Sequence, residues 1–163
     1  MSEASRREVR QGLEPCLARL WRYGLVLSGA NDVAEGLALA ACGRAIERAD
    51  QFPAGARLDR WLFAMLRSIW LHEVRPSRIR DAKGFVGADG PAWNDGGFQI
   101  DANILADRVL KSLGRLPEAQ PGTALLVCGE GYSYAEAATA LAIPVDAVAS
   151  HLAAARSALT NLR

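Results

Sequence analysis

Four residues near the C-terminus restrict the fold of this chain more than any other feature. Ser133-Tyr134-Ala135-Glu136 has the pattern Ser-x-x-Glu of a helix capping box. In a capping box, the serine hydroxyl accepts a hydrogen bond from a free backbone amide, and the glutamate carboxylate reaches back to the serine amide. The pattern therefore predicts a helix over Tyr134–Leu141.

A second helix is expected directly after the first. Ala142-Ile143-Pro144 leaves room only for a tight connection, and proline is favoured at the start of a helix. The next helix is predicted from Val145 to near Leu162, and a short apolar helix over Gly122–Gly129 precedes the pair. Two helices joined by so short a turn form a helix-turn-helix.

The first 80 residues predict three more helices, because apolar residues recur there at three- and four-residue steps. The helices are expected over Val9–Leu27, Asp32–Ala49 and from Arg57 to about Val74. The stretch Ser28–Asp32 supplies a stop and a new N-cap, and Pro76 is expected to end or kink the third helix near Val74–Arg75. The sequence thus predicts an all-α protein.

Two small helical domains are predicted, with a linker between them. Residues 1–80 form the first domain and residues 102–163 the second, which opens with a helical pattern over Asn103–Leu116. Residues 81–101 contain five glycines, one proline and four aspartates, a composition typical of a flexible, Gly-rich linker.

Composition and charge exclude several classes of function. Residues 1–80 hold 13 Lys and Arg against 9 Asp and Glu, so the first domain is basic although the whole chain carries only +1. The three scattered cysteines form no CxxC pair, and no catalytic or metal-ligating cluster is recognisable, so we expect no enzyme, metal, cofactor or small-molecule substrate. The start is polar, and no apolar run could cross a bilayer, which predicts a cytoplasmic protein without membrane contact.

Two separate blocks of sequence resemble the extracytoplasmic-function (ECF) type of bacterial RNA polymerase sigma factor. Glu130–Leu152 reads EGYSYAEAATALAIPVDAVASHL, and the family's region 4 commonly reads E-G-x-S-Y-x-E-I/A-A-x-x-L-G-I-P-x-G-T-V-K-S-R-L. Arg57–Arg75 reads RLDRWLFAMLRSIWLHEVR and is similar to the region 2 helix that engages the −10 promoter element, particularly in the alphaproteobacterial general-stress sigma factors. The two blocks occur in the family's order, with a linker between them.

The resemblance implies a stress-response transcription factor whose partners are the polymerase core, promoter DNA and an anti-sigma factor. Region 2 would bind the β′ clamp helices and the −10 element, and region 4 the β flap and the −35 element. The residues implied on the −10 side also suit phosphate binding and base stacking. They are Arg57, Arg60, Trp61, Arg67, Arg75, Arg78 and Arg80, although the helical spacing of Trp61 also fits a core position.

The helix expected to meet the polymerase departs from the family pattern. Asp32, Glu35, Leu39 and Arg44 are the expected contacts, but Leu39 stands where the family has glutamine. Two acidic positions and a leucine of the family are also replaced, by Gly36, Ala40 and Gly43. An exposed apolar face is usually an interface.

The expected recognition helix also departs from the family pattern, because small apolar residues replace polar ones. Ser150, His151 and Arg156 are its expected DNA contacts, whereas alanines stand at 147, 149 and 154, where the family offers threonine, lysine and arginine. Two hypotheses follow. The chain is a working sigma factor, or it is a sigma-like mimic that binds an anti-sigma factor or another regulator without recognising promoters.

Overall fold

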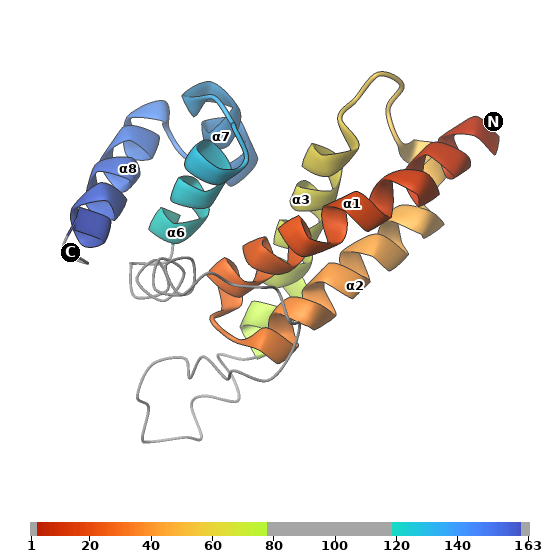
Figure 1. The fold of residues 1–163 in the computed structure, drawn as a ribbon, viewed down its shortest axis with the longest axis horizontal. Helices are drawn as coiled ribbons and strands as arrows, with labels where there is room; N and C mark the ends of the chain where they lie inside the picture. Colours follow the sequence, from red (N-terminus) through yellow and green to blue (C-terminus); the bar gives the residue numbers. More distant parts are fainter. Residues whose placement is uncertain (1–2, 78–118, 161–163) are drawn as a thin grey trace. The chain divides into compact units, whose positions relative to one another are not determined.

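The computed structural model describes residues 3–77 and 119–160. The chain divides into two compact units, Met1–Asn94 and Asp95–Arg163, and each is described by itself. Every element in the described ranges is helical (Figure 1), which confirms the all-α fold. The linker over 81–101, the expected helix over 103–116, and Arg78 and Arg80 lie outside the described residues.

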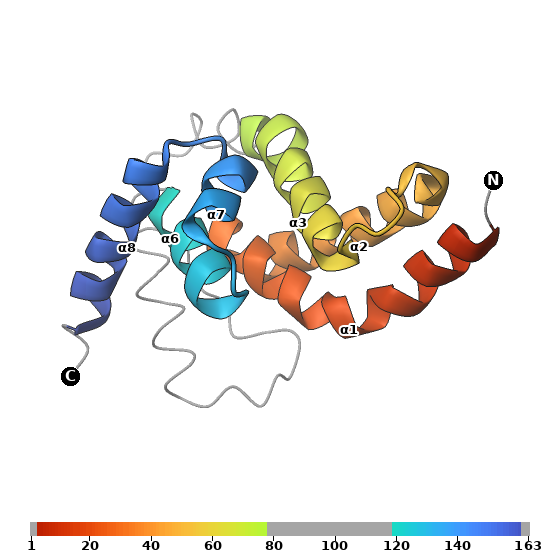
Figure 2. The ribbon, with the colours of Figure 1, turned by 90° about the horizontal axis from the view of Figure 1, so that it is seen from above.

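The first unit is built on an antiparallel helix pair. Helices α1 (Glu3–Ser28) and α2 (Asn31–Glu47) run side by side in opposite directions, and α3 (Leu58–Ile69) packs against both (Figures 1 and 2). A 3-10 turn, η1 (Ala49–Gln51), follows α2. The three helices enclose a core of large apolar side chains, among them Leu20, Tyr23, Leu37, Leu62 and Leu66.

Gly24 sets how closely α1 and α2 approach each other. A Cβ atom built on Gly24 would lie 3.1 Å from the Cα atom and from the carbonyl oxygen of Ala34. These are backbone atoms that cannot rotate away, so any side chain at this position would require α1 and α2 to separate by a few tenths of an ångström. Nearby, the ring of Tyr23 meets the ring of Phe63 edge-on, with 5.2 Å between the centroids, and this contact joins α3 to α1.

The N-cap of α2 is Ala30, which lies within the stretch Ser28–Asp32 where the sequence predicts a cap, but its side chain makes no capping hydrogen bond. The helix begins at Asn31, one residue earlier than expected. The side chain of Ser28, at the end of α1, instead makes the hydrogen bonds of the turn between α1 and α2. Its hydroxyl donates to the carbonyl oxygen of Gly24 at 2.7 Å and accepts from the amide of Ala30 at 3.3 Å.

The sequence predicts that Pro76 ends or kinks the third helix near Val74–Arg75, and the structure shows that the helix does not end there. After α3, a wider π-helical turn, η2 (Trp70–Val74), continues the helix, and helical conformation extends to Ser77. The amide of Arg75 donates to the carbonyl oxygen of Trp70, five residues back. A π turn relaxes the backbone just before proline, whose ring would crowd the preceding turn of a regular α-helix.

The second unit holds the helix-turn-helix. Helix α6 (Ala119–Ala124) passes into a π turn, η3 (Leu125–Gly129), and is followed by α7 (Tyr134–Leu141) and α8 (Val145–Thr160). Helices α7 and α8 are bent by 102° to each other, within the range of helix-turn-helix motifs. Helix α8 packs against α6 and α7, and α7 also contacts η3. Thr123, Leu126, Val148 and Leu152 are among the fully buried residues of this unit.

No helix in the described ranges is by itself long and apolar enough to cross a membrane. The bent pair of α7 and α8 reaches the required length and composition only when its two helices are joined.

Candidate functional site

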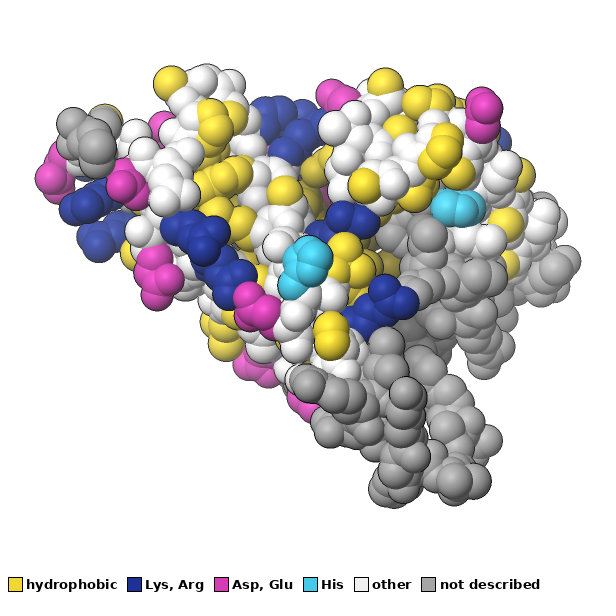
Figure 3. All heavy atoms as spheres, turned by 180° about the vertical axis from the view of Figure 1, so that it is seen from behind, with side chains coloured by type: hydrophobic (Ala, Val, Ile, Leu, Met, Phe, Trp, Pro, Cys, Tyr) yellow, Lys and Arg dark blue, Asp and Glu magenta, His cyan; other side chains and the backbone are white. Residues whose placement is uncertain are grey.

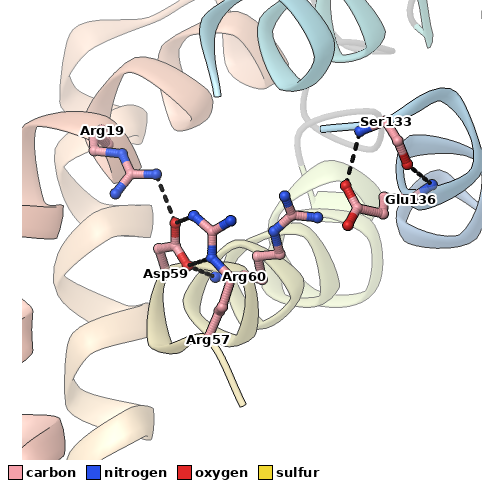
Figure 4. Close-up of polar contacts among 6 residues, drawn as sticks. All are labelled: Arg19, Arg57, Asp59, Arg60, Ser133 and Glu136. Atoms are coloured by element: carbon pink, nitrogen blue, oxygen red, sulfur yellow. Dashed lines mark hydrogen bonds and ion pairs between the residues drawn. The ribbon is translucent and has the colours of Figure 1, made fainter. Parts of the chain in front are cut away.

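A charged cluster fixes the start of α3, the helix expected to face DNA. Asp59 lies in the first turn of α3 and is 9% exposed. Its carboxylate accepts hydrogen bonds from Arg19 on α1 at 2.8 Å and from Arg57 at 2.9 Å (Figure 4). The backbone amide of Arg60 donates to the same carboxylate at 2.9 Å. One carboxylate thus accepts hydrogen bonds from two guanidinium groups and from a backbone amide in the first turn of α3, where no preceding helical turn supplies an acceptor.

The pKa of Asp59 reflects two opposed effects. Burial raises the pKa of this carboxyl, but hydrogen bonds from Arg19, from Arg57 and from the amide of Arg60 outweigh burial and lower it. Arg19 also lies over the ring of Phe63, 5.6 Å from its centroid. Asp59 is therefore ionised at neutral pH and anchors α3 to α1.

The basic residues of α3 form one face of the helix. Arg57, Arg60 and Arg67 follow one another at helical spacing, and Ala64 and Ser68 are exposed on the same face. The side chain of Arg57 remains 61% exposed while it binds Asp59. Figure 3 shows one face of the first unit, on which groups of basic side chains lie among hydrophobic and acidic ones.

The two tryptophans of α3 and η2, Trp61 and Trp70, are buried to different degrees. Trp70 is buried, with 6% of its surface exposed. Trp61 is half-buried, and its ring lies 5.1 Å from the ring of Phe52, which belongs to the connection between α2 and α3. Arg60, Arg67 and Arg75 are half-buried, so each presents only part of its side chain to solvent.

Helix α2 presents a largely apolar face to solvent. Leu39 is 60% exposed and Ile46 is 42% exposed. Gly36, Ala40 and Gly43 are exposed on the same face, and a Cβ atom on either glycine would meet nothing within 4 Å. Packing within the unit therefore does not require these glycines, and they leave the helix surface flat.

The charged residues expected to meet the polymerase lie in two different settings. Asp32 and Glu35 are exposed near the start of α2. Arg44 is not equally open, because its guanidinium binds the carboxylate of Glu73 on η2 at 2.8 Å, and only 28% of its side chain is exposed. Arg44 thus connects the α2 face to the continuation of α3.

The capping box at the start of α7 is formed as the sequence predicts. The amide of Glu136 donates to the Ser133 hydroxyl at 3.1 Å, and the amide of Ser133 donates to the Glu136 carboxylate at 2.8 Å (Figure 4). Helix α7 ends at Leu141, and the C-cap residue Ala142 has φ of 53° and lies in the left-handed region. The family pattern has glycine at this position, and alanine pays a steric penalty there.

The three residues of α8 that are expected to contact DNA differ in their exposure to solvent. Ser150 and Arg156 are exposed. His151 is half-buried, and its Nδ1 atom lies 3.2 Å from the hydroxyl of Thr123 on α6, a fully buried residue. The inner ring nitrogen of His151 therefore holds α8 against α6, and only the rest of the ring faces outward.

Sequence reasoning missed three residues that position the candidate site, Arg19, Glu73 and Thr123. Each binds a partner 28 to 40 residues away in the chain. Local sequence patterns carry no signal for such pairs. In the ranges 3–77 and 119–160, no three His, Cys, Asp or Glu side chains come together as a metal site.

Comparisons with known proteins point to one family. No family model matches the chain. The chain is 28% identical over 154 residues to the ECF RNA polymerase sigma factor EcfG of Rhodopseudomonas palustris (strain TIE-1), which covers 94% of this chain and 84% of that protein. Its structure is similar to that of the sigma factor RpoE from Bartonella quintana, solved in complex with the anti-sigma factor NepR. That likeness has a TM-score of 0.80, 27% identity and 96% coverage of both chains.

Proposed function

We propose that this chain, an ECF-type RNA polymerase sigma factor of the alphaproteobacterial type, directs the polymerase to promoters through separate surfaces on α2, α3 and α8. The observation that carries this proposal is the likeness to a sigma factor over 96% of both chains, at a TM-score of 0.80. It extends over a three-helix unit with a basic α3 and a unit with a capped helix-turn-helix.

The exposed face of α3 is the proposed −10 surface. Arg57, Arg60, Arg67 and Arg75 would bind backbone phosphates through their guanidinium groups, which donate two hydrogen bonds at once. Trp61 offers the exposed part of its ring to an unstacked base. Arg78 and Arg80 extend this basic sequence beyond the described residues.

The exposed face of α2 is the proposed polymerase-binding surface. Asp32 and Glu35 supply charge at its start, and Leu39 supplies apolar contact area in its middle. Arg44 acts through its ion pair with Glu73, so we propose that it positions the junction of α2 and η2. The partners proposed are the β′ clamp helices for α2 and the β flap for the second unit.

Helix α8 is the proposed −35 reader, with Ser150, His151 and Arg156 on or near its outer side. Two domains with the bounds 1–80 and 102–163 would separate the −10 and −35 functions. We further propose that an anti-sigma factor binds this chain, as NepR binds the Bartonella sigma factor. Like other sigma factors, the chain would act in the cytoplasm and catalyse no reaction itself.

Transcription reconstituted from purified components tests the proposal. The full-length chain and core polymerase are expected to produce transcripts from selected promoters, and core polymerase alone is not. Because the DNA contacts proposed are largely ionic, promoter binding should weaken steeply as salt rises. A chain that fails to bind core polymerase and yields no specific transcript would disprove the proposal.

A second candidate function rests on the small and apolar residues of α2 and α8. Gly36, Leu39 and Ala40 on α2 and Ala149 on α8 replace polar positions of the family. A sigma-like mimic would bind an anti-sigma factor through such faces without promoter recognition. It would bind the anti-sigma protein tightly and leave core polymerase inactive at every promoter, an outcome opposite to that of the working factor.

A further inference from the structure

The N-terminal half of α8 exposes methyl groups where a recognition helix usually exposes hydrogen-bond donors. In helix-turn-helix proteins, the first residues of the second helix contact base edges. The exposed residues of α8 from its start to Ala153 are Val145, Asp146, Ala149, Ser150 and Ala153, and Val145 is 49% exposed. Three of these five side chains end only in methyl groups.

The polar groups on this face have little donor capacity left. The hydroxyl of Ser150 donates to the carbonyl oxygen of Asp146 at 3.2 Å, so its single proton is already used within the helix. The carboxylate of Asp146 accepts hydrogen bonds and donates none. His151, at the edge of the face, engages Thr123 through Nδ1, which leaves Nε2 as its only other ring nitrogen for a partner. In the described part of α8, Arg156 is the one exposed cation, and it lies three turns beyond Val145.

Bases differ in what they offer to such a surface. Guanine presents two acceptors in the major groove and needs a donor from the protein. Thymine presents a C5-methyl group, for which alanine is a common partner. A face made of methyl groups and one carboxylate therefore matches thymine far better than guanine.

We infer that α8 selects its DNA site chiefly through apolar contacts between Val145, Ala149 and Ala153 and the C5-methyl groups of thymines. Asp146 adds to the preference against guanine. Its carboxylate accepts hydrogen bonds from the exocyclic amino groups of adenine and cytosine, and it repels the acceptor atoms of guanine. This inference rests on the proposed function, since it assigns base specificity to the proposed −35 surface. The base specificity of α8 then depends on thymine methyl groups more than on hydrogen bonds from side chains, while phosphate contacts supply most of the affinity.

Deoxyuridine provides the test, because it differs from thymidine only in lacking the methyl group. Holoenzyme made from the full-length chain and core polymerase is first used to select duplexes from a randomised library. Each thymidine in the upstream selected element is then replaced in turn by deoxyuridine. The loss of one buried methyl contact should weaken binding by about fourfold, and replacements outside the element should leave binding unchanged.

A double-mutant cycle ties the DNA methyl group to a protein methyl group. The variant Ala149→Gly removes one methyl group from α8, and the effect of deoxyuridine at the facing position should then disappear. Any general weakening of the helix by glycine affects thymidine and deoxyuridine DNA equally, so it cancels in the cycle. The matched control is Ala135→Gly on α7, an exposed alanine of the other helix, which should keep the full deoxyuridine effect.

The outcomes separate this inference from the proposed function. Active holoenzyme whose binding is unchanged by every deoxyuridine replacement overturns the inference and leaves the proposed function standing. Selected elements that carry guanines in place of thymines at the α8 contacts overturn it as well. A chain that selects no DNA with core polymerase fails the proposed function, and the inference falls with it.

Discussion

Asp59 on α3 holds Arg19 on α1 by a hydrogen bond of 2.8 Å across 40 residues of sequence. The carboxylate is nearly buried, and 30% of the Arg19 side chain remains exposed. This contact fixes the start of α3 on the helix pair below it. The proposed −10 surface therefore depends on a residue that does not itself face DNA.

Replacement of Asp59 by asparagine should destabilise the first unit. Asparagine keeps the volume of the side chain but removes the charge that binds two guanidinium groups. Because both arginines are partly exposed and can be rehydrated, we expect a loss of about 1–3 kcal/mol in the free energy of unfolding. Urea unfolding followed by tryptophan fluorescence measures it, since all four tryptophans lie within residues 1–94. Asp50→Asn, at an exposed site on η1, is the control and should change stability little.

The same carboxylate predicts a dependence of stability on pH. The pKa of Asp59 is lower in the folded chain than in the unfolded chain, where it is about 3.9. Its contribution is therefore fully present above that value and is lost as the pH falls through the lower, folded pKa. The stability difference between the natural chain and Asp59→Asn should be constant from about pH 7 to pH 5 and should shrink below about pH 4. A difference that stayed constant down to pH 3 would contradict this assignment.

Replacing Gly24 or Gly36 of the first unit by alanine should have opposite effects on its free energy of unfolding. Gly24→Ala places a methyl group 3.1 Å from backbone atoms of Ala34 and forces α1 and α2 apart, at a cost of about 1–3 kcal/mol. Gly36→Ala meets nothing within 4 Å and should stabilise α2 by about 0.5–1 kcal/mol. Denaturant midpoints of the two variants test both signs. Similar effects of both substitutions would show that the close approach at Gly24 is unimportant.

Glycine in the helix-turn-helix turn should stabilise the second unit. Ala142 has φ of 53°, a conformation that costs a non-glycine residue about 1 kcal/mol. Ala142→Gly should recover part of this strain, although glycine also raises the entropy of the unfolded chain. Slower hydrogen exchange in α7 and α8 would report the gain. Ala153→Gly, an exposed site within α8, should do the reverse and speed exchange there.

Removal of Arg156 should reduce the salt dependence of promoter binding. If its guanidinium binds one phosphate, Arg156→Ala makes the slope of log K against log salt less steep by about 0.9. The slope is measured with holoenzyme on a selected promoter between low and moderate salt. Arg6→Ala, an exposed arginine on α1, serves as the control. An unchanged slope for Arg156→Ala would place this residue away from the DNA backbone.

The local helical structure of this chain is determined by its sequence. The capping box of Ser133 and Glu136, the turn before Pro144 and the bounds of α7 follow from residues a few positions apart, because these contacts form within one or two helical turns. The resemblance to sigma factors likewise rests on patterns along the chain. The sequence left open whether Pro76 ends or kinks the third helix, because the π turn that carries the helix past the proline has no recognisable sequence pattern.

Only the tertiary structure decided which charged and polar residues stay available for partners. Arg57 binds Asp59, Arg44 binds Glu73, and His151 engages Thr123. The last two pairs, like that of Arg19 and Asp59, join residues 28 to 40 positions apart on different helices. Helical periodicity gives the face on which a side chain lies, but its partner depends on how the helices pack, because packing brings distant side chains within hydrogen-bond distance.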